Sequence, residues 1–231
     1  MGEYHTLSTA DGSFRLYIDY PDETPAPVVV VLQELFGINN DLRQSCRELA
    51  EQGFIAICPD LFWRQEPGLD LNEWSEQDWK KGLALYAAYD FDAGERDIEA
   101  VVAAARHLEG ANGKVGVMGY CLGGLMTYLT AARSSIDAGV EYYGGGTEKY
   151  LAEAPAIKAP LMMHLGEEDE FISKDAQAKI KAAFAEKDNV TINSYPGCSH
   201  AFARHTGTHY DANAASLANG RTYQFLHQHL A

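Results

Sequence analysis

The stretch from Lys114 to Leu125 constrains the fold more than any other part of this 231-residue chain. It reads K-V-G-V-M-G-Y-C-L-G-G-L: a short apolar run, a glycine-rich turn around Cys121, and then helix-forming residues as far as Arg133. Strand, Gly-x-Cys-x-Gly turn and helix make the nucleophile-elbow pattern, with cysteine in the place of serine. Such a turn strains the backbone of its central residue, which explains the small neighbours Gly119 and Gly123.

The position of Cys121 suits a reactive thiol. Unpaired N–H groups at the start of the following helix favour a thiolate. The same groups can hold an oxyanion. The alternative interpretation is a buried structural cysteine beside a glycine-rich turn.

Strand-like and helix-like segments alternate along the chain, and we identify no linker or repeat. The β-branched run 28–31 is typical of a central parallel strand buried on both faces, and Asp41 is a candidate N-cap for the helix that follows it. We therefore predict a single α/β domain over residues 1–231, with a mostly parallel central sheet and helices on both faces. The expected strands are 13–20, 27–32, 54–58, 115–118, 138–143, 160–166 and 190–195, and the expected helices are 41–52, 74–89, 97–108, 125–133, 174–185 and 213–230.

Charge and composition narrow the possible partners. A net charge of −15 and a sequence pI near 4.8 argue against nucleic acid and anionic membranes as partners. The N-terminus has no signal-peptide pattern and no run is long enough to span a membrane, so we expect a cytoplasmic protein. The four cysteines lack C-x-x-C spacing and are expected to be free thiols. We expect a monomer or a weak homo-oligomer.

Polar residues follow several expected strands, at the sheet edge where α/β proteins carry their sites. Glu34 follows the run 28–32, Asp169 follows strand 160–166, and His200 follows strand 190–195. Nucleophile, acid and histidine then occur in the order of the α/β-hydrolase triad. His200 would exchange a proton with Cys121, and Asp169 would orient the His200 ring. Glu167, Glu168 and Glu170 compete with Asp169 for that role, and His200 could be an ordinary loop histidine.

The chain resembles the dienelactone hydrolase (carboxymethylenebutenolidase) family of α/β-hydrolases over nearly its whole length. The motifs that carry the resemblance are 33–37 (QELFG), 58–61 (CPDL), 119–124 (GYCLGG), 142–144 (YYG) and 200–204 (HAFAR).

The resemblance implies a role for each matching residue. Cys121, Asp169 and His200 match the triad. Glu34 matches a carboxylate that contacts the cysteine and takes part in its activation when substrate binds. Arg204 matches an arginine that binds the substrate carboxylate. The backbone N–H groups of Leu35 and Leu122 would form the oxyanion hole, and Phe36 and Tyr143, within matched motifs, are expected to contact the substrate.

The chain departs from the family at one position. The family's enzyme of dienelactone catabolism has a second carboxylate-binding arginine in the helical stretch before Tyr86. An ungapped count from Cys58 places Trp79 there. A tryptophan at this position favours a more apolar or aromatic ester or lactone.

The reaction predicted is cysteine-dependent hydrolysis of a small lactone or activated ester through a thioester, with no cofactor and no metal. Two alternatives remain: a redox protein in which Cys198 resolves an oxidised Cys121, and a non-catalytic carboxylate-binding protein on a hydrolase scaffold. His200, His205 and His209 with Cys198 could suggest a metal, but their spacing fits no compact site.

Overall fold

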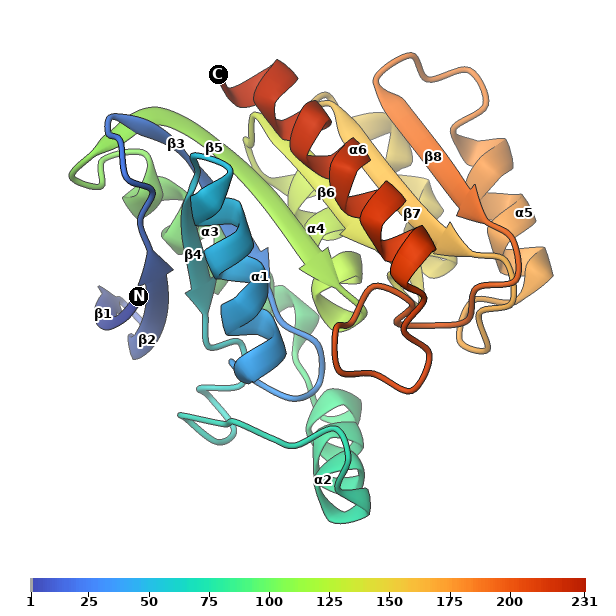
Figure 1. Cartoon of the computed structure of the whole chain (residues 1–231), viewed down its shortest axis with the longest axis horizontal. Helices are drawn as coiled ribbons and strands as arrows, with labels where there is room; N and C mark the ends of the chain where they lie inside the picture. Colours follow the sequence, from blue (N-terminus) through green and yellow to red (C-terminus); the bar gives the residue numbers. More distant parts are fainter. Residues whose placement is uncertain (1) are drawn as a thin grey trace.

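The computed structural model describes residues 2–231 and contains an eight-stranded sheet with helices on both faces (Figure 1). The strands are β1 (Glu3–Thr9), β2 (Gly12–Asp19), β3 (Ala26–Leu32), β4 (Ile55–Pro59), β5 (Ala111–Tyr120), β6 (Ala138–Tyr142), β7 (Leu161–Gly166) and β8 (Val190–Tyr195). Their order across the sheet is β1-β2-β4-β3-β5-β6-β7-β8. From β4 to β8 in this order, neighbouring strands pair in parallel. The pairs β1–β2 and β2–β4 are antiparallel. The predicted fold class is confirmed.

The centre of the sheet is apolar on both faces. Val28 to Val31 in β3 are fully buried, as are Val115 and Val117 in the neighbouring β5. Burial on both faces explains why these strands read as continuous β-branched runs and not as alternating ones. Each such side chain contributes roughly 1.5–3 kcal/mol on burial, so the strands on either side of the elbow lie within the hydrophobic core.

The helices form two layers around the sheet. They are α1 (Asn40–Glu51), α2 (Glu76–Ala87), α3 (Phe91–Ala105), α4 (Leu122–Arg133), α5 (Lys174–Ala183) and α6 (Ala212–Leu230), together with the 3₁₀ helix η1 (Thr147–Ala156). In Figure 1, α1 and α6 lie in front of the sheet, and α3 and α4 lie behind it. Within residues 2–231, none of these helices combines the length and apolarity that a bilayer crossing needs.

The start of α1 differs from the sequence prediction. Asn39 caps the helix, because its side chain accepts a hydrogen bond from the Leu42 N–H at 3.0 Å. The prediction of Asp41 as the cap is wrong. Asp41 lies in the first turn, where its carboxylate instead accepts a hydrogen bond from the backbone N–H of His205 at 2.8 Å.

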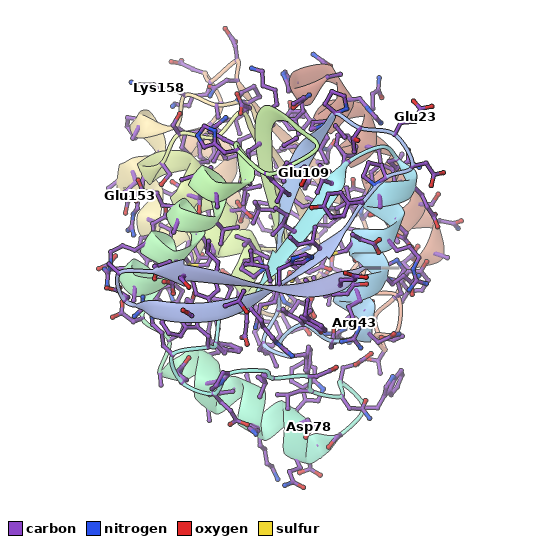
Figure 2. The ribbon with its side chains drawn as sticks, turned by 90° about the vertical axis from the view of Figure 1, so that its left-hand side faces the viewer. Glu23, Arg43, Asp78, Glu109, Glu153 and Lys158 are labelled. Carbon is purple, nitrogen blue, oxygen red and sulfur yellow. The ribbon has the colours of Figure 1, made fainter. Side chains whose placement is uncertain are left out.

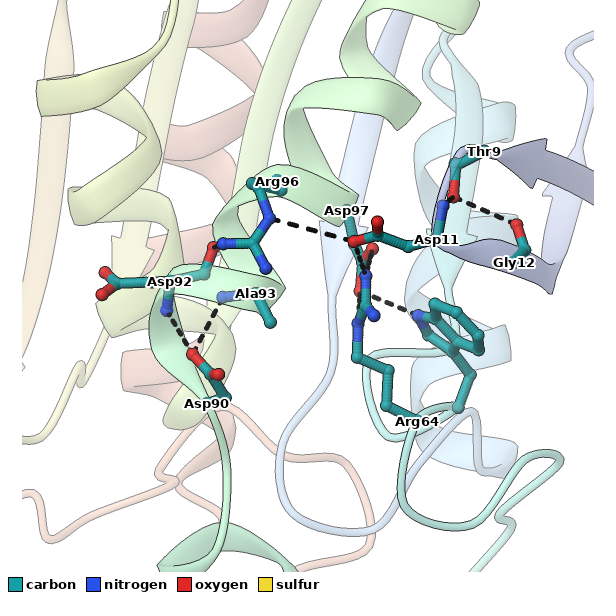
Figure 3. A network of polar contacts seen from close by, with 10 residues as sticks. Thr9, Asp11, Gly12, Arg64, Asp90, Asp92, Ala93, Arg96 and Asp97 are labelled. Carbon is teal, nitrogen blue, oxygen red and sulfur yellow. Dashed lines mark hydrogen bonds and ion pairs between the residues drawn. The ribbon is translucent and has the colours of Figure 1, made fainter.

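A network of charged side chains ties the N-terminal hairpin to the rest of the fold (Figure 3). Arg64, in the segment after β4, binds both Asp97 of α3 and Asp11 of the hairpin turn, with nitrogen–oxygen distances of 2.8 Å to each. The indole N–H of Trp63 donates to the same Asp97 carboxylate at 2.8 Å. Asp97 is buried, so a charged and hydrogen-bonded partner is needed there. The network fixes the beginning of the segment that leads from β4 to α2.

Helix α2 lies beyond the carboxyl ends of the parallel strands. Figure 1 shows it below the sheet, and Figure 2, turned by 90°, shows the same helix with Asp78 beyond the same edge. Its buried residue is Gly82. A Cβ on Gly82 would collide with the side chain of Leu35 and would lie 2.7 Å from the Leu35 carbonyl oxygen. The absence of a side chain therefore lets α2 cover the segment that follows β3.

Candidate active site

Cys121 lies at the turn between β5 and α4 in a conformation that L-residues rarely adopt. Its backbone angles are φ 54° and ψ −110°, a strained geometry that clusters at functional sites. A Cβ on Gly119 would collide with the backbone of Gly123, and a Cβ on Gly123 would collide with the backbone of Leu32. The two glycines therefore allow the elbow to press against the end of β3.

Two backbone segments meet beside Cys121. Leu122 is the first residue of α4, where N–H groups lack intrahelical partners. Leu35 follows β3 and lines the same pocket as Cys121. The Gly123 N–H donates to the Gln33 carbonyl at 2.9 Å and so joins the elbow to the segment after β3. This bond sets the two segments that carry Leu35 and Leu122 side by side.

The structure brings Asp169 and His200 together, although they follow different strands. The His200 Nδ1 lies 2.8 Å from Asp169 Oδ2. The other carboxylate oxygen of Asp169 accepts the N–H groups of Phe171 at 2.8 Å and Ile172 at 3.1 Å. A carboxylate held by three hydrogen bonds is fixed in position, which is what the orienting member of a triad requires.

Two of the three competing acids, Glu168 and Glu170, have other partners. Glu168 forms an exposed ion pair with Lys174 at 2.7 Å. Glu170 accepts the backbone N–H of His200 at 3.2 Å, so it holds the main chain of the histidine and not its ring. Among the four acids of this turn, Asp169 thus has the geometry of the ring-orienting carboxylate.

His200 favours its charged form. Burial lowers the pKa of His200, but the charge of the Cys121 thiolate and the hydrogen bonds to Asp169 and Cys121 outweigh that effect and raise the pKa to about 10. The rings of Phe171 and Tyr143 contact the imidazole edge-on, with centroids at 4.7 and 5.1 Å. The His200 ring is therefore held between Asp169 and Cys121, with aromatic rings beside it.

Glu34 and Arg204 form a second buried pair in the same pocket. Arg204 Nη1 lies 2.8 Å from Glu34 Oε2, and both side chains are more than nine-tenths buried. Burial lowers the pKa of Arg204, but Glu34 outweighs it and the net shift is upward. Glu34 Oε1 and Arg204 Nε are buried without a hydrogen-bond partner among the described residues. Unused polar atoms of this kind, next to a pocket, are free to bind a ligand.

Aromatic rings surround the Arg204 guanidinium. Its carbon lies 5.1 Å from the centroid of Phe36 and 5.7 Å from that of Trp79. Phe36 and Trp79 contact each other edge-on at 4.9 Å. The cation is thus held on one side by a carboxylate and on the other by two rings.

The pocket above Cys121 is small and almost entirely apolar. It encloses about 70 Å³, well below the ~300–1,000 Å³ of pockets for drug-sized ligands. The residues around it are Glu34, Leu35, Phe36, Trp79, Leu83, Tyr86, Cys121, Gly145, Phe171, His200 and Arg204. Leu83 and Phe171 are also substantially exposed, so they form its apolar rim.

Tyr143 does not line this pocket. It is fully buried behind His200 and packs edge-on against Phe202 as well. Its expected contact with substrate is not seen in the geometry, and its place is that of a support for the histidine ring.

Tyr86, Leu83, Gly145 and Phe171 line the pocket without having been expected there. Burial raises the pKa of Tyr86, and its electrostatic interaction with Cys121, which lines the same pocket, adds to the effect. Trp79, Leu83 and Tyr86 recur at helical spacing on one face of α2. This helical spacing, counted from Trp79, is a sequence signal that could have identified Leu83 and Tyr86 as pocket residues.

Among the described residues, no group of three or more His, Cys, Asp or Glu side chains is arranged to hold a metal ion. His205 and His209 face carboxylates and a backbone carbonyl.

Comparison with known proteins shows extensive similarity. The family model of the dienelactone hydrolase family matches residues 14–230. A carboxymethylenebutenolidase of Pseudomonas putida is 39% identical over 222 residues, which cover 96% of this chain and 94% of the relative. Carboxymethylenebutenolidase 1 of Cupriavidus pinatubonensis is 37% identical over 219 residues, covering 95% and 93% of the two chains. The crystal structure of an assigned dienelactone hydrolase from Klebsiella pneumoniae superimposes with a TM-score of 0.86 at 26% identity, covering 99% of this chain and 98% of that one.

Proposed function

Because this chain belongs to the dienelactone hydrolase family, whose members hydrolyse lactones and esters, we propose that it cleaves its substrate with Cys121 as nucleophile and through a thioester. The observation that carries the proposal is the line from Asp169 through His200 to Cys121, on an elbow whose backbone is strained at the cysteine. Each group has the role that the triad mechanism gives to its residue type.

The first half of the reaction forms the thioester. The Cys121 thiolate attacks the substrate carbonyl carbon, and the carbonyl oxygen becomes an oxyanion held by the N–H groups of Leu35 and Leu122. The tetrahedral intermediate collapses as the carbon–oxygen bond breaks. The leaving alkoxide or enolate takes a proton from the His200 imidazolium.

The second half releases the acid. Water attacks the thioester carbon and gives a proton to neutral His200, which Asp169 keeps oriented. The second tetrahedral intermediate expels the Cys121 thiolate, and the thiolate–imidazolium pair is restored. A thiolate leaves such an intermediate more easily than an amine does, so this order of steps favours esters and lactones over amides.

Glu34 would link substrate binding to activation of the thiol. In the structure its carboxylate is bound to Arg204, and its other oxygen has no hydrogen-bond partner among residues 2–231. A substrate carboxylate that binds Arg204 competes with Glu34 for the same guanidinium. Glu34, released from Arg204, is then free to take part in activating the Cys121 thiol.

The pocket favours a small, flat substrate. The relatives named above are called carboxymethylenebutenolidases, and Arg204 offers a guanidinium for one carboxylate. Trp79 fills the position expected for a second arginine and packs on Phe36, so the rest of the wall is apolar. We propose a lactone or activated enol or aryl ester, bound with its ring against Trp79 and Phe36.

Initial hydrolysis rates on three substrates test this function. The panel pairs a carboxylated dienelactone with its uncarboxylated analogue and adds a simple aryl ester, each with wild type and Cys121→Ala. We expect Cys121→Ala to lose at least about 10³-fold in kcat on all three. Denatured, acid-quenched wild type should carry an acyl mass on Cys121. If Cys121→Ala matches wild type, the elbow cysteine is structural and the proposed mechanism fails.

A further inference from the structure

His205, the neighbour of Arg204 in the loop between β8 and α6, is held between two carboxylates of α1. Its Nδ1 lies 2.9 Å from Asp41 Oδ1, and its Nε2 lies 3.0 Å from Glu48 Oε1. Its backbone N–H also donates to Asp41 Oδ1 at 2.8 Å. Asp41 and Glu48 are seven residues apart, so they lie two turns apart on one face of the helix.

This geometry requires a charged ring. An ionised carboxylate only accepts hydrogen bonds, so both imidazole nitrogens must carry a proton to bind both partners. Burial lowers the pKa of His205, but the hydrogen bonds to Asp41 and Glu48 outweigh it and raise the pKa to about 10. Burial raises the pKa of Glu48, but the bonds from His205 and Gln44 leave it lowered. The pKa shifts of His205 and Glu48 therefore both favour an ion pair between these two residues.

Two tyrosines and one cation also lie near the ring. From α6, Tyr223 donates to Glu48 Oε2 at 3.4 Å, and from the same loop the Tyr210 ring lies 6.3 Å from the imidazole. Arg204 is the nearby cation, and Asp41 acts electrostatically on it as well. The carboxylate of Asp41 thus serves both basic residues at once.

The loop that presents Arg204 is anchored by the two residues that follow it. His205 binds α1, and the Thr206 hydroxyl donates to Glu73 in the segment before α2. Glu73 in turn accepts the Trp79 indole N–H through its backbone carbonyl at 2.6 Å. Within residues 2–231, the side chain that forms a hydrogen bond with the guanidinium is Glu34. The two anchors therefore join the chain directly after Arg204 to α1 and to the segment before α2, and the contact of His205 with α1 is the charged one.

We propose that His205 is a positioning residue: its imidazolium, bound by Asp41 and Glu48, fixes the loop so that Arg204 faces the pocket and receives a substrate carboxylate. This inference rests on the carboxylate-binding role proposed for Arg204. Loss of the His205 charge should weaken binding of carboxylated substrates and leave the triad chemistry intact.

The test compares kcat/KM for the carboxylated dienelactone with kcat/KM for its uncarboxylated analogue. In His205→Gln, which keeps a neutral donor, we expect this ratio to fall about tenfold through the KM of the carboxylated substrate, because small displacements of binding groups have large effects. The uncarboxylated analogue should stay within about twofold of wild type. The control is His107→Gln, an exposed histidine, which should match wild type on both substrates.

Further measurements make every outcome decisive. Glu48→Gln leaves the bond to Asp41 and should give a smaller shift in the same direction; it replaces His205→Gln if that variant does not fold. Nitrogen-15 spectra of wild type should show the His205 ring doubly protonated at pH 8. Equal loss on both substrates, no loss, or a neutral ring at pH 8 overturns the inference.

If Arg204→Met leaves the ratio unchanged, the proposed role of Arg204 is wrong and the inference falls with it. A low ratio in Arg204→Met with a normal one in His205→Gln rejects the inference alone.

Discussion

Trp79 lines the pocket beside Arg204 and Phe36. It contacts Phe36 edge-on, lies 5.7 Å from the Arg204 guanidinium, and is held by a 2.6 Å hydrogen bond to the Glu73 carbonyl. A cation over an indole face gains about 0.5–2 kcal/mol, depending on desolvation. Trp79 therefore supports Arg204 while it keeps the opposite wall uncharged.

Replacing Trp79 with arginine should move the preference toward carboxylated substrates. A second guanidinium near Arg204 adds charge-assisted hydrogen bonds to a carboxylate, whereas loss of the indole removes an apolar wall. We expect the KM of a carboxylated dienelactone to fall about three- to tenfold and the KM of an aryl ester to rise by a similar factor. Steady-state kinetics on both substrates measure the two shifts.

Trp79→Phe is the matched control, because it keeps an aromatic ring and adds no charge. It should raise KM modestly for both substrates. If Trp79→Arg and Trp79→Phe shift the two KM values in the same way, the charge at position 79 does not determine the substrate.

The site residues differ in how far sequence could specify them. The elbow requires small residues around Cys121 for steric reasons, so the glycine pattern predicts it from the sequence alone. The choice of Asp169 over its three acidic neighbours depends on the turn that aims its carboxylate at the His200 ring. His205 could not have been found, because its partners Asp41 and Glu48 lie more than 150 residues away in the sequence.

Among the secondary-structure elements, α2 contributes one wall of the pocket. It covers the pocket with one apolar face and rests on Leu35 through Gly82. Leu35 is also the residue whose backbone N–H we assign to the oxyanion hole. The distance between α2 and the end of β3 therefore affects the geometry of that N–H.

Gly82→Ala should impair turnover. The added Cβ meets the Leu35 side chain and its carbonyl, so the helix or the Leu35 peptide must move. Loss of one oxyanion donor costs about 10²–10³-fold in kcat, and we expect about tenfold or more from its displacement. Stopped-flow measurement of the acylation burst separates this effect from substrate binding.

Gly220→Ala provides the control. Gly220 is exposed on α6 and a Cβ there meets nothing within 4 Å. Alanine in place of glycine stabilises an exposed helix by about 1 kcal/mol, so Gly220→Ala should raise the melting temperature slightly and keep full activity. Unchanged kcat in Gly82→Ala would show that α2 does not determine the position of Leu35.

The elements that sequence missed are those whose pattern is weak. The β-branched run in β3 was unambiguous, because both of its faces are buried. β1 is mostly exposed and polar, and it is a strand because it pairs with β2. α3 begins at Phe91, six residues before the expected start at 97, because the Asp90 side chain accepts the N–H groups of Asp92 and Ala93. That capping signal lies before the apolar periodicity that defines the rest of the helix.

Over the whole molecule, buried ionisable groups set the pH range of stability in both directions. His164 is fully buried between Tyr195 and Thr222, and burial lowers its pKa to about 3. The unfolded chain protonates this ring near pH 6.5, so stability from His164 is lost as pH falls from about 6.5 toward 3. His200 and His205, with pKa values of about 10, act in the opposite direction. Their contribution is lost as pH rises from about 6.5 through 10.

Glu141 adds a third dependence that one substitution can isolate. It lies in β6 beside the elbow strand, is fully buried, and accepts a hydrogen bond from Thr147 at 2.7 Å. Burial raises its pKa to about 8, which outweighs the lowering effect of Thr147. An unfolded glutamate ionises near pH 4.3, so the folded state is progressively disfavoured as pH rises from there to about 8.

Glu141→Gln keeps the shape of the side chain and removes its titration. The free energy of unfolding of this variant, relative to wild type, should therefore increase between pH 5 and pH 8 and level off above pH 8. The gain should approach but not exceed about 1.4 kcal/mol per pH unit. The contributions of His164, His200 and His205 are common to both proteins and cancel in the difference.

Urea unfolding at half-unit pH intervals measures this difference in the free energy of unfolding. The control is Glu109→Gln, at an exposed residue labelled in Figure 2, which should keep the wild-type dependence on pH. If the difference between Glu141→Gln and wild type does not vary with pH, Glu141 is ionised in the folded protein. A positive charge beside the elbow would then have to stabilise it, because the hydrogen bond from Thr147 alone does not.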